Sequence, residues 1–269
     1  MKRITSLGLK FLMKRLKERL KGSKIQKIKQ IKDAYSFEIY KGDKSYLMII
    51  PDKTLFLTGE NYGGEPKDDF CNVLRKHLTG QLIEDIGQHE FDRVVEIETR
   101  GYKLIAELFG NGNLILVKKP ENEIVRATNM RSWATRDIKP KKEYKYPPPG
   151  INPLKLSLED IRFYLGKKEI VKVLASDFGF GGEIAEKICE KIGIDKDSKE
   201  EKNAEKIHEF LKIVDKEFPG MNNLNDKIRD EFEKHLKEID LFEGVVQKKL
   251  EKIKKDQDKK MEEFIEKEN

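Results

Sequence analysis

The sequence has few of the residues that build metal centres or disulfide frameworks. Its 269 residues include two cysteines and four histidines, and Cys71 and Cys189 lack Cys or His neighbours at zinc-ligand spacing. No apolar run approaches the roughly 20 residues of a membrane span. Residues 1–30 are cationic and amphipathic, without the apolar core of a signal peptide. We therefore expect a cytoplasmic protein with no metal, no cofactor and no membrane partner.

Familiar catalytic motifs are also missing. The sequence contains no Gly-x-Ser-x-Gly, no His-Glu-x-x-His and no phosphate-binding Gly-Lys-Ser/Thr loop. A nucleophile paired with a base is therefore not visible. We expect no enzymatic activity and no small-molecule substrate.

Charge, by contrast, is abundant. Charged residues make up 39% of the chain, against a usual quarter or so, and 55 Lys and Arg outnumber 49 Asp and Glu. A mildly basic protein with a pI near 8.9 suits a nucleic-acid partner. Enrichment in Lys and Glu suits a heat-adapted soluble protein equally well. The two interpretations are compatible, and composition does not choose between them.

The first half of the chain alternates between helical and strand patterns. In the first helix, a leucine-rich face opposes several lysines, which suit a solvated face better than phosphate contacts. Thr5 or Ser6 would cap it and Gly22 would end it. Arg75 and Lys76 end the second helix, where they complement its dipole or, alternatively, contact RNA. Helices are predicted at 5–21 and 66–78, and strands at 24–31, 35–41, 45–50, 54–58, 81–88 and 123–128.

Residues 90–117 predict an antiparallel meander. Two alternating hydrophobic runs flank a Gly-Tyr turn, and a third run follows the Gly-Asn-Gly-Asn segment at 110–113. Asp92 and Arg93 stand just before the first strand. Neighbours on a strand point to opposite faces, and a charge that points inward needs a partner. Taken alone, this pair is best explained as an ion pair that stabilises the strand end.

Residues 129–137 have no clear period and hold the single tryptophan. Trp133 lies between Arg131 and Arg136. An RNA-contacting loop would use guanidinium groups on phosphates and the indole for stacking. The alternative is a tryptophan that anchors the loop, with arginines on the surface. Residues 139–149 then form an extended linker that ends in three prolines.

The second half is helical and charged. Residues 177–188 look like a helix-hairpin-helix motif, in which Gly179, Gly181 and Gly182 make a tight turn and the next helix begins there. Its free N–H groups and Lys187 could face a phosphate. The alternative is a helix end packed in a small core. Helices are predicted at 157–165, 167–175, 198–217, 225–240 and 244–267, the last with near-heptad spacing that is too short for a confident coiled coil.

Five segments together resemble the N-terminal region of the NFACT family. This family includes the RqcH-like and NEMF-like ribosome quality-control factors and proteins once labelled fibronectin-binding. The resemblance implies an α+β fold: a β-rich domain similar to formamidopyrimidine DNA glycosylases at 1–149, a helix-hairpin-helix domain at 150–220, and the start of a coiled coil at 221–269. We expect the chain to be part of a longer protein, although a natural short paralogue is an alternative. The matching segments are Ile4–Ser6, Leu74–Leu78, Glu90–Val117 with Asp92-Arg93, Glu107–Phe109 with Gly112–Leu116, and Tyr144–Pro149.

The resemblance also implies a function. Family members bind a large ribosomal subunit that carries a stalled peptidyl-tRNA, recruit tRNA and support untemplated C-terminal tailing, with alanine in bacteria and archaea. The Asp-Arg pair required for tailing corresponds to Asp92 and Arg93, which become expected tRNA contacts. Gly8 stands where family members often carry Asp, which leaves tailing in question.

Two other functions are alternatives. The glycosylase-like fold suggests a DNA-repair protein, but the chain begins Met1-Lys2-Arg3 and lacks the N-terminal Pro and adjacent Glu of those enzymes. The old label suggests an adhesive, protein-binding module. RNA binding should weaken steeply with salt, whereas a hydrophobic protein contact should not.

Overall fold

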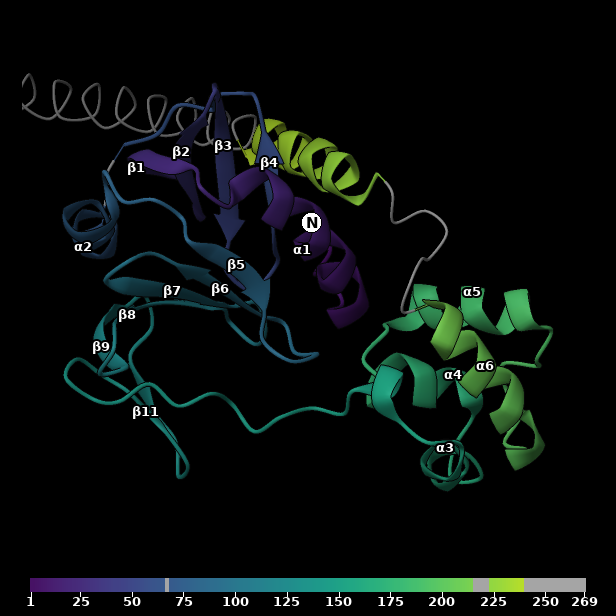
Figure 1. Ribbon diagram of the computed structural model, residues 1–269. Helices are drawn as coiled ribbons and strands as arrows, with labels where there is room; N and C mark the ends of the chain where they lie inside the picture. Colours follow the sequence, from purple (N-terminus) through teal and green to yellow (C-terminus); the bar gives the residue numbers. More distant parts are fainter. Residues whose placement is uncertain (66–67, 215–222, 240–269) are drawn as a thin grey trace, which may run out of the picture. The chain divides into compact units, whose positions relative to one another are not determined.

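The chain begins with an amphipathic helix, α1 (Ser6–Leu20), in a computed structural model that describes residues 1–65, 68–214 and 223–239 (Figure 1). Thr5 caps it, as predicted, because its hydroxyl accepts a 3.1 Å hydrogen bond from the Gly8 amide. The leucine-rich face is buried and the cations lie outside. Buried positions are Leu7, Gly8, Leu9, Leu12, Met13, Leu16 and Leu20.

The first sheet confirms the four predicted strands to within two residues. It consists of β1 (Lys24–Ile31), β2 (Ala34–Lys41), β3 (Asp43–Ile50) and β4 (Thr54–Thr58), in sequence order and antiparallel throughout. The predicted turn at Lys41–Asp43 joins β2 to β3, with Gly42 at φ 84°.

Helix α2 (Asp69–Leu78) follows and packs against β1. Asp68 caps it by accepting from the Cys71 amide at 2.6 Å, so the helix begins three residues after the predicted start at residue 66. Residues 66–67 lie outside the described part of the chain. In Figure 1, α1 and α2 lie at opposite ends of the strand layers.

The second sheet is the predicted meander extended by one strand on each side. Its order is β5 (Asp85–Gln88), β6 (Val94–Glu98), β7 (Tyr102–Glu107), β8 (Asn113–Lys118) and β9 (Glu123–Ala127), again antiparallel. The predicted strand 81–88 is four residues too long. Gln81 and Ile83 instead bond to the start of β1, so this segment ties the two sheets together before β5 begins.

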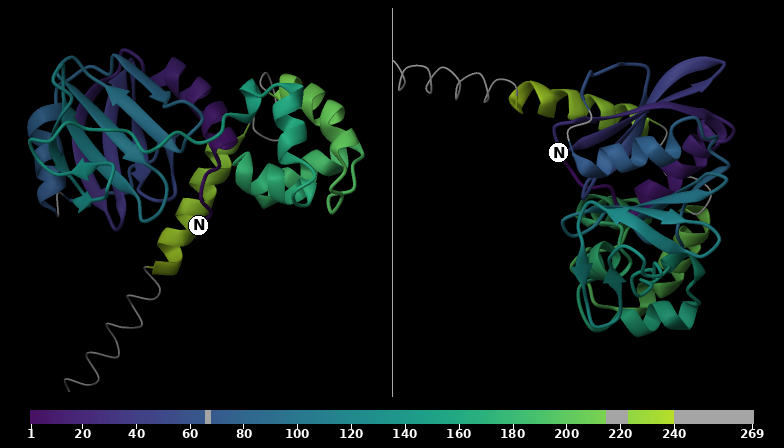
Figure 2. Two further views of the ribbon diagram at one scale, coloured as in Figure 1. Left: turned by 90° about the horizontal axis from the view of Figure 1, so that it is seen from below. Right: turned by 90° about the vertical axis from the view of Figure 1, so that its left-hand side faces the viewer.

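A hairpin and the linker cover one face of the second sheet. Residues 129–137, predicted to be irregular, contain the short strands β10 (Arg131–Ser132) and β11 (Asp137–Ile138). Ile138 and Tyr144 then pack onto the sheet, and both are buried. The linker is therefore part of the core on this face (Figures 1 and 2). The sheet residues beneath them are Val94, Ile105, Ile115, Val117, Ile124 and Ala127.

Short helices form the next part of the chain. The predicted helix 167–175 starts at Ile170 and changes to a π-helix, because Phe178 bonds back five residues to Val173. The predicted helix 198–217 begins only at Ala204 after a 3-10 turn, and residues 215–217 lie outside the described part. The elements are η1 (Pro153–Lys155), α3 (Leu158–Tyr164), α4 (Ile170–Lys172), η2 (Val173–Asp177), α5 (Gly182–Ile192), η3 (Glu201–Asn203) and α6 (Ala204–Val214).

Residues 224–239 are also helical, close to the predicted 225–240. The described residues divide into two units: one holds Lys2–Asp226, and the other holds Met1 and the residues from Lys227 to 239. The mixed fold with antiparallel sheets is confirmed. The glycosylase likeness, the helix-hairpin-helix assignment and the three-domain division stay predictions, and the predicted coiled-coil segment 244–267 lies outside the described residues.

Candidate nucleic-acid interface

The turn between β5 and β6 carries Asp92 and Arg93. It is closed by a 2.9 Å bond from the His89 amide to the Val94 carbonyl and a 3.1 Å bond from the Asp92 amide to the His89 carbonyl. The Gln88 side chain donates to the Asp92 carbonyl at 2.9 Å and to the Ser6 carbonyl at 3.0 Å. The turn is therefore fixed to the start of α1.

Asp92 holds the linker. Its Oδ1 accepts from the Gly150 amide at 3.2 Å, and a Cβ on Gly150 would lie only 2.9 Å from that oxygen. Its other oxygen, Oδ2, is buried and has no hydrogen-bond partner among the described residues. A buried carboxylate oxygen without a hydrogen bond costs free energy, and a ligand that donates a hydrogen bond to Oδ2 would remove this cost.

Arg93 has no acidic partner in the described part of the chain, and the simple ion pair with Asp92 is not formed. Its backbone carbonyl accepts from Leu108 at 2.7 Å, which anchors the residue at the sheet edge. Burial lowers the pKa of its guanidinium, and the neighbouring charge of Arg3 lowers it further. A partly buried cation facing another cation is a suitable place for an anion to bind.

Arg3 is the residue that sequence reasoning missed. It donates to the Gly110 carbonyl at 2.9 Å and lies 3.3 Å from Asp52 Oδ2. Gly112 makes this approach of loops possible, because a Cβ there would meet the Asp52 amide nitrogen at 2.1 Å. Arg3 lies 107 positions from Gly110, so no local pattern could have placed it beside Arg93.

Arg136 is a correction to the predicted interface. It is 8% exposed and forms a two-pronged ion pair with Glu107, with Nη1–Oε1 and Nη2–Oε2 distances of 2.5 and 3.0 Å. Despite burial, the hydrogen bond and charge of Glu107 raise the pKa of Arg136, and Tyr144 also donates to Glu107 at 2.9 Å. The expectation of a surface arginine was wrong, because its charge is neutralised inside the protein.

Trp133 and Arg131 remain accessible. The indole is 44% exposed, and the Arg136 guanidinium lies over it at 4.8 Å from the ring centroid. Arg131 is exposed on β10. The hairpin therefore presents one aromatic ring that is held from behind by the buried ion pair.

The glycine turn before α5 packs against the N-terminal segment. Gly179 and Gly181 both have positive φ, and a Cβ on Gly181 would lie 2.9 Å from Thr5 Cγ2. The close approach that requires glycine is thus an internal one. Gly182 begins α5 and is exposed.

Lys187 is paired with a carboxylate rather than left for a phosphate. Its ammonium lies 2.8 Å from Glu183, which also pairs with Lys2 at 3.0 Å. The hydrogen bonds from Lys187 and Lys2 lower the pKa of Glu183 to about 2. A phosphate that used Lys187 would first have to displace this carboxylate.

Arg75 and Lys76 lie apart from the other predicted contacts. They occupy the last turn of α2, at the end of the β layers away from α1 and the β5–β6 turn (Figure 1). Both are exposed, whereas the adjacent His77 is held by a 2.8 Å hydrogen bond between its Nδ1 and the Tyr102 hydroxyl. They complement the helix dipole, the simpler of their two predicted roles.

The linker is tied to the turn by a polar cluster on the second sheet. Glu96 accepts from the Tyr146 hydroxyl at 2.5 Å and from Lys103 at 2.8 Å, and its Oε1 lies 3.1 Å from His89 Nδ1. His89 stacks on Tyr146 with ring centroids 3.6 Å apart. Burial and the bond to Glu96 raise the pKa of Tyr146 to about 12.

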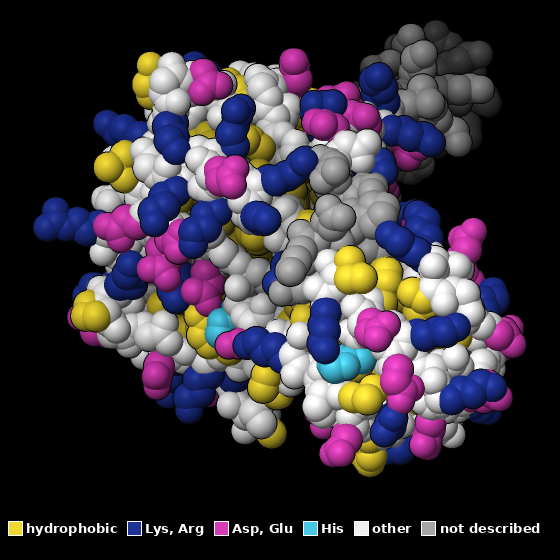
Figure 3. All heavy atoms as spheres, turned by 45° about the vertical axis from the view of Figure 1, so that its right-hand side comes forward, with side chains coloured by type: hydrophobic (Ala, Val, Ile, Leu, Met, Phe, Trp, Pro, Cys, Tyr) yellow, Lys and Arg dark blue, Asp and Glu magenta, His cyan; other side chains and the backbone are white. Residues whose placement is uncertain are grey.

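The described residues show neither a large patch of one charge in Figure 3 nor a metal site. Lys and Arg side chains are interspersed with Asp and Glu over the face shown in Figure 3. Across residues 1–65, 68–214 and 223–239, no group of three His, Cys, Asp or Glu side chains is placed to hold a metal ion. None of the helices in these ranges has the length and apolar character to cross a bilayer.

Comparison with known proteins identifies the family of this chain. The family described as NFACT N-terminal and middle domains matches residues 5–267, so the chain belongs to the NFACT family. It is 37% identical over 202 residues to the archaeal Rqc2 homolog aRqcH of Methanocaldococcus jannaschii, covering 70% of this chain and 29% of that protein. It is 30% identical over 177 residues to the Rqc2 homolog RqcH of Bacillus subtilis, covering 57% and 31%. The chain thus spans about a third of the length of these relatives.

Solved structures agree on the fold. The N-terminal part of the fibronectin/fibrinogen-binding protein of Streptococcus suis superposes with a TM-score of 0.64 at 26% identity, covering 77% of this chain and 84% of that one. The fibrinogen-binding protein of Staphylococcus aureus gives 0.63 at 25% identity, with 77% and 82% covered. The family resemblance predicted from the sequence is confirmed.

Proposed function

We propose that this chain is the tRNA-binding N-terminal region of a ribosome quality-control factor. Its relatives are named as Rqc2 and RqcH homologs. In this proposal the whole protein binds a large ribosomal subunit with a stalled peptidyl-tRNA and supports alanine-type tailing of the nascent chain. The ribosome performs peptidyl transfer, and this region holds tRNA without catalysing a reaction.

The observation that carries the proposal is the state of Arg93. This partly buried guanidinium has no carboxylate partner in the part of the chain that the structure describes, and Arg3 repels it, so a phosphate or a base edge is expected to stabilise it. Asp92 contributes in two ways: it holds Gly150, and its unpaired Oδ2 could accept from a base. Both residues sit on a rigid turn, which keeps the entropic cost of binding low.

The other predicted residues contribute to tRNA binding in different ways. Trp133 offers a stacking face and Arg131 a phosphate contact on the same hairpin, while Arg136 positions the indole from inside. At the start of α5, Gly182 remains accessible for a backbone contact of the helix-hairpin-helix type, and Lys187 would join only after leaving Glu183. Arg75 and Lys76 would act as peripheral contacts at the far end.

The test is a salt series of tRNA binding, with double-stranded DNA of equal length as the competing ligand. Arg93→Gln removes the proposed contact, and Arg100→Gln is the matched control, because Arg100 is an exposed arginine in the turn at the other end of β6. The logarithm of the tRNA association constant falls linearly with the logarithm of the salt concentration, and loss of one phosphate contact should make this slope shallower by about 0.7–0.9. We expect that change in Arg93→Gln and not in Arg100→Gln.

The same assay includes fibronectin as a third ligand, because the solved relatives are named as fibronectin- or fibrinogen-binding proteins. Binding to fibronectin that is insensitive to salt, with no binding to tRNA, would support the adhesive alternative. A preference for DNA over tRNA would support the repair alternative. Equal effects of the two arginine substitutions would remove the site assignment.

A further inference from the structure

Positive charge is concentrated on one helix. Residues 6–21 contain six lysines and arginines and a single glutamate, a net charge of +5, whereas the whole chain has a net charge of only +6. The cations include like-charged neighbours four positions apart, such as Lys10 with Lys14 and Arg15 with Arg19. Such pairs destabilise a helix by a few tenths of a kcal/mol each. Burial of the leucine face holds α1 together in spite of this repulsion.

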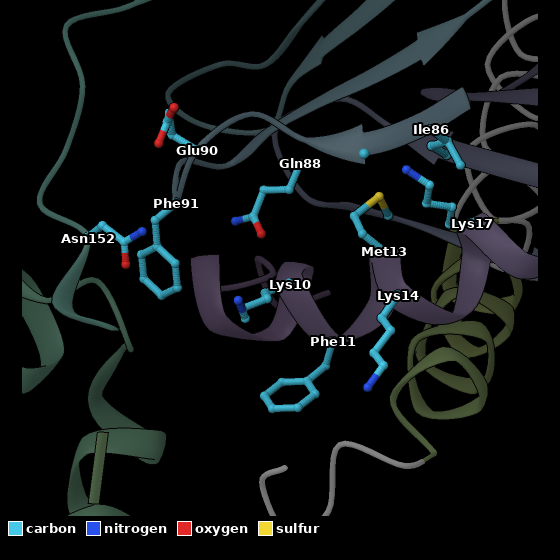
Figure 4. Close-up of a pocket in the computed structure, with 11 residues that line it drawn as sticks. Lys10, Phe11, Met13, Lys14, Lys17, Ile86, Gln88, Glu90, Phe91 and Asn152 are labelled. Atoms are coloured by element: carbon cyan, nitrogen blue, oxygen red, sulfur yellow. The ribbon is translucent and has the colours of Figure 1, made fainter. Parts of the chain in front are cut away.

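Part of this basic face borders a groove next to the candidate interface. A cavity of about 400 Å³ lies between α1 and the β5–β6 turn. On the helix side it is bordered by Lys10, Lys14 and Lys17, and on the other side by Gln88, Glu90 and Phe91 (Figure 4). Phe91 precedes Arg93 by two residues, so the groove adjoins the turn that carries the proposed tRNA contact.

The electrostatics of the groove favour an anion. Lys17 is paired with Asp85 at 2.9 Å, and this contact lowers the pKa of that carboxyl. Glu90 lies 3.8 Å from Lys155, so its charge is partly balanced. Lys14 is exposed and forms no ion pair with any described residue. The charged residues that line this cavity are three lysines and one glutamate, an excess of two positive charges.

We propose that the groove and the basic face of α1 form a second RNA-contact surface, which binds phosphates of the same RNA that Arg93 contacts. This inference rests on the proposed function. Lys10, Lys14 and Lys17 recur at four and three positions, about 6 and 4.5 Å apart along the axis, so they form a row that can follow a nucleic-acid backbone. Contacts of this kind are independent of base sequence, and they would orient the RNA along α1.

The test neutralises two of the three lysines that border the groove. Lys10→Gln/Lys14→Gln is compared with Lys206→Gln/Lys212→Gln, two exposed lysines on α6 that give the same change in net charge. We expect the salt dependence of tRNA binding to become shallower by about 1.5 in Lys10→Gln/Lys14→Gln and to stay unchanged in Lys206→Gln/Lys212→Gln. Thermal unfolding of both variants checks that each remains folded, so that a change in slope reports binding.

Two outcomes would overturn the inference while leaving the proposed function in place. In the first, Arg93→Gln lowers the slope but Lys10→Gln/Lys14→Gln does not. In the second, the α6 control lowers the slope as much as the groove variant, which would reveal an effect of net charge alone. A wild-type chain that binds no tRNA at low salt would overturn both proposals together.

Discussion

Substitution of Arg136 should destabilise the fold strongly, whereas substitution of Arg93 should leave its stability almost unchanged. Arg136→Met leaves Glu107, which is 3% exposed, without its cation. Breaking a buried ion pair from one side costs about 3–5 kcal/mol, because the remaining charge stays buried. Arg93→Gln removes a cation that has no acidic partner among the described residues, so the free energy of unfolding of this variant should stay within about 0.5 kcal/mol of the wild type.

Urea unfolding measures this contrast. The midpoint should fall strongly in Arg136→Met, with the slope m unchanged, and stay in place in Arg93→Gln. Because Arg136→Met could leave little folded protein, the double variant Glu107→Met/Arg136→Met is the second arm. Replacing both partners with apolar side chains leaves no unpaired charge, so most of the lost stability should return.

Two results of the urea experiment would contradict these expectations. If Arg136→Met loses less than about 1 kcal/mol, the ion pair does not anchor the hairpin. If Arg93→Gln loses as much as Arg136→Met, then Arg93 is a structural residue, and a drop in tRNA binding would reflect unfolding rather than a lost contact. Binding must therefore be measured on samples whose folded fraction is known.

Three further predictions concern single groups. Trp133 is the only tryptophan, so tRNA binding should quench its fluorescence if a base stacks on it, and Arg131→Gln should weaken that response. Glu96→Gln should bring the pKa of Tyr146 down from about 12, measured by ultraviolet titration against Tyr146→Phe; an unchanged titration would show that burial alone sets this value. Burial, and then Lys76, lower the pKa of His77, so its stabilising contribution is complete above its unfolded pKa of about 6.5 and declines as the pH falls below that value. Wild type should therefore lose more stability in acid than His77→Gln, and parallel pH profiles would contradict this.

Local patterns predicted the elements well where the signal lies in neighbouring residues. Alternation and Gly-Asn turns predicted β6, β7 and β8, and the cap at Thr5 followed from residue type and position. The π-helix after α4 was missed, because the pattern of buried residues is close to that of an ordinary helix. Strand β5 is shorter than predicted, because residues 81–83 pair with residues 22–25 at the start of β1, 56–61 positions earlier.

The candidate site was harder to predict, because its partners are distant in sequence. Asp92 and Arg93 were selected through family resemblance, and the sequence alone favoured an ion pair that does not form. The sequence does not predict that Arg136 is buried, because its partner Glu107 lies 29 positions away in the chain, at the end of β7. Arg3 was not considered, since only the packing of the loop at 110–113 against Asp52 places it near Arg93.

The buried pair of Glu107 and Arg136 also constrains how this sequence can evolve. A lineage that replaced only one partner would pass through a protein weakened by about 3–5 kcal/mol, a large part of the 5–15 kcal/mol that holds a typical domain folded. Selection would remove most such intermediates. Descendants of this sequence are therefore expected to keep both residues or to exchange both.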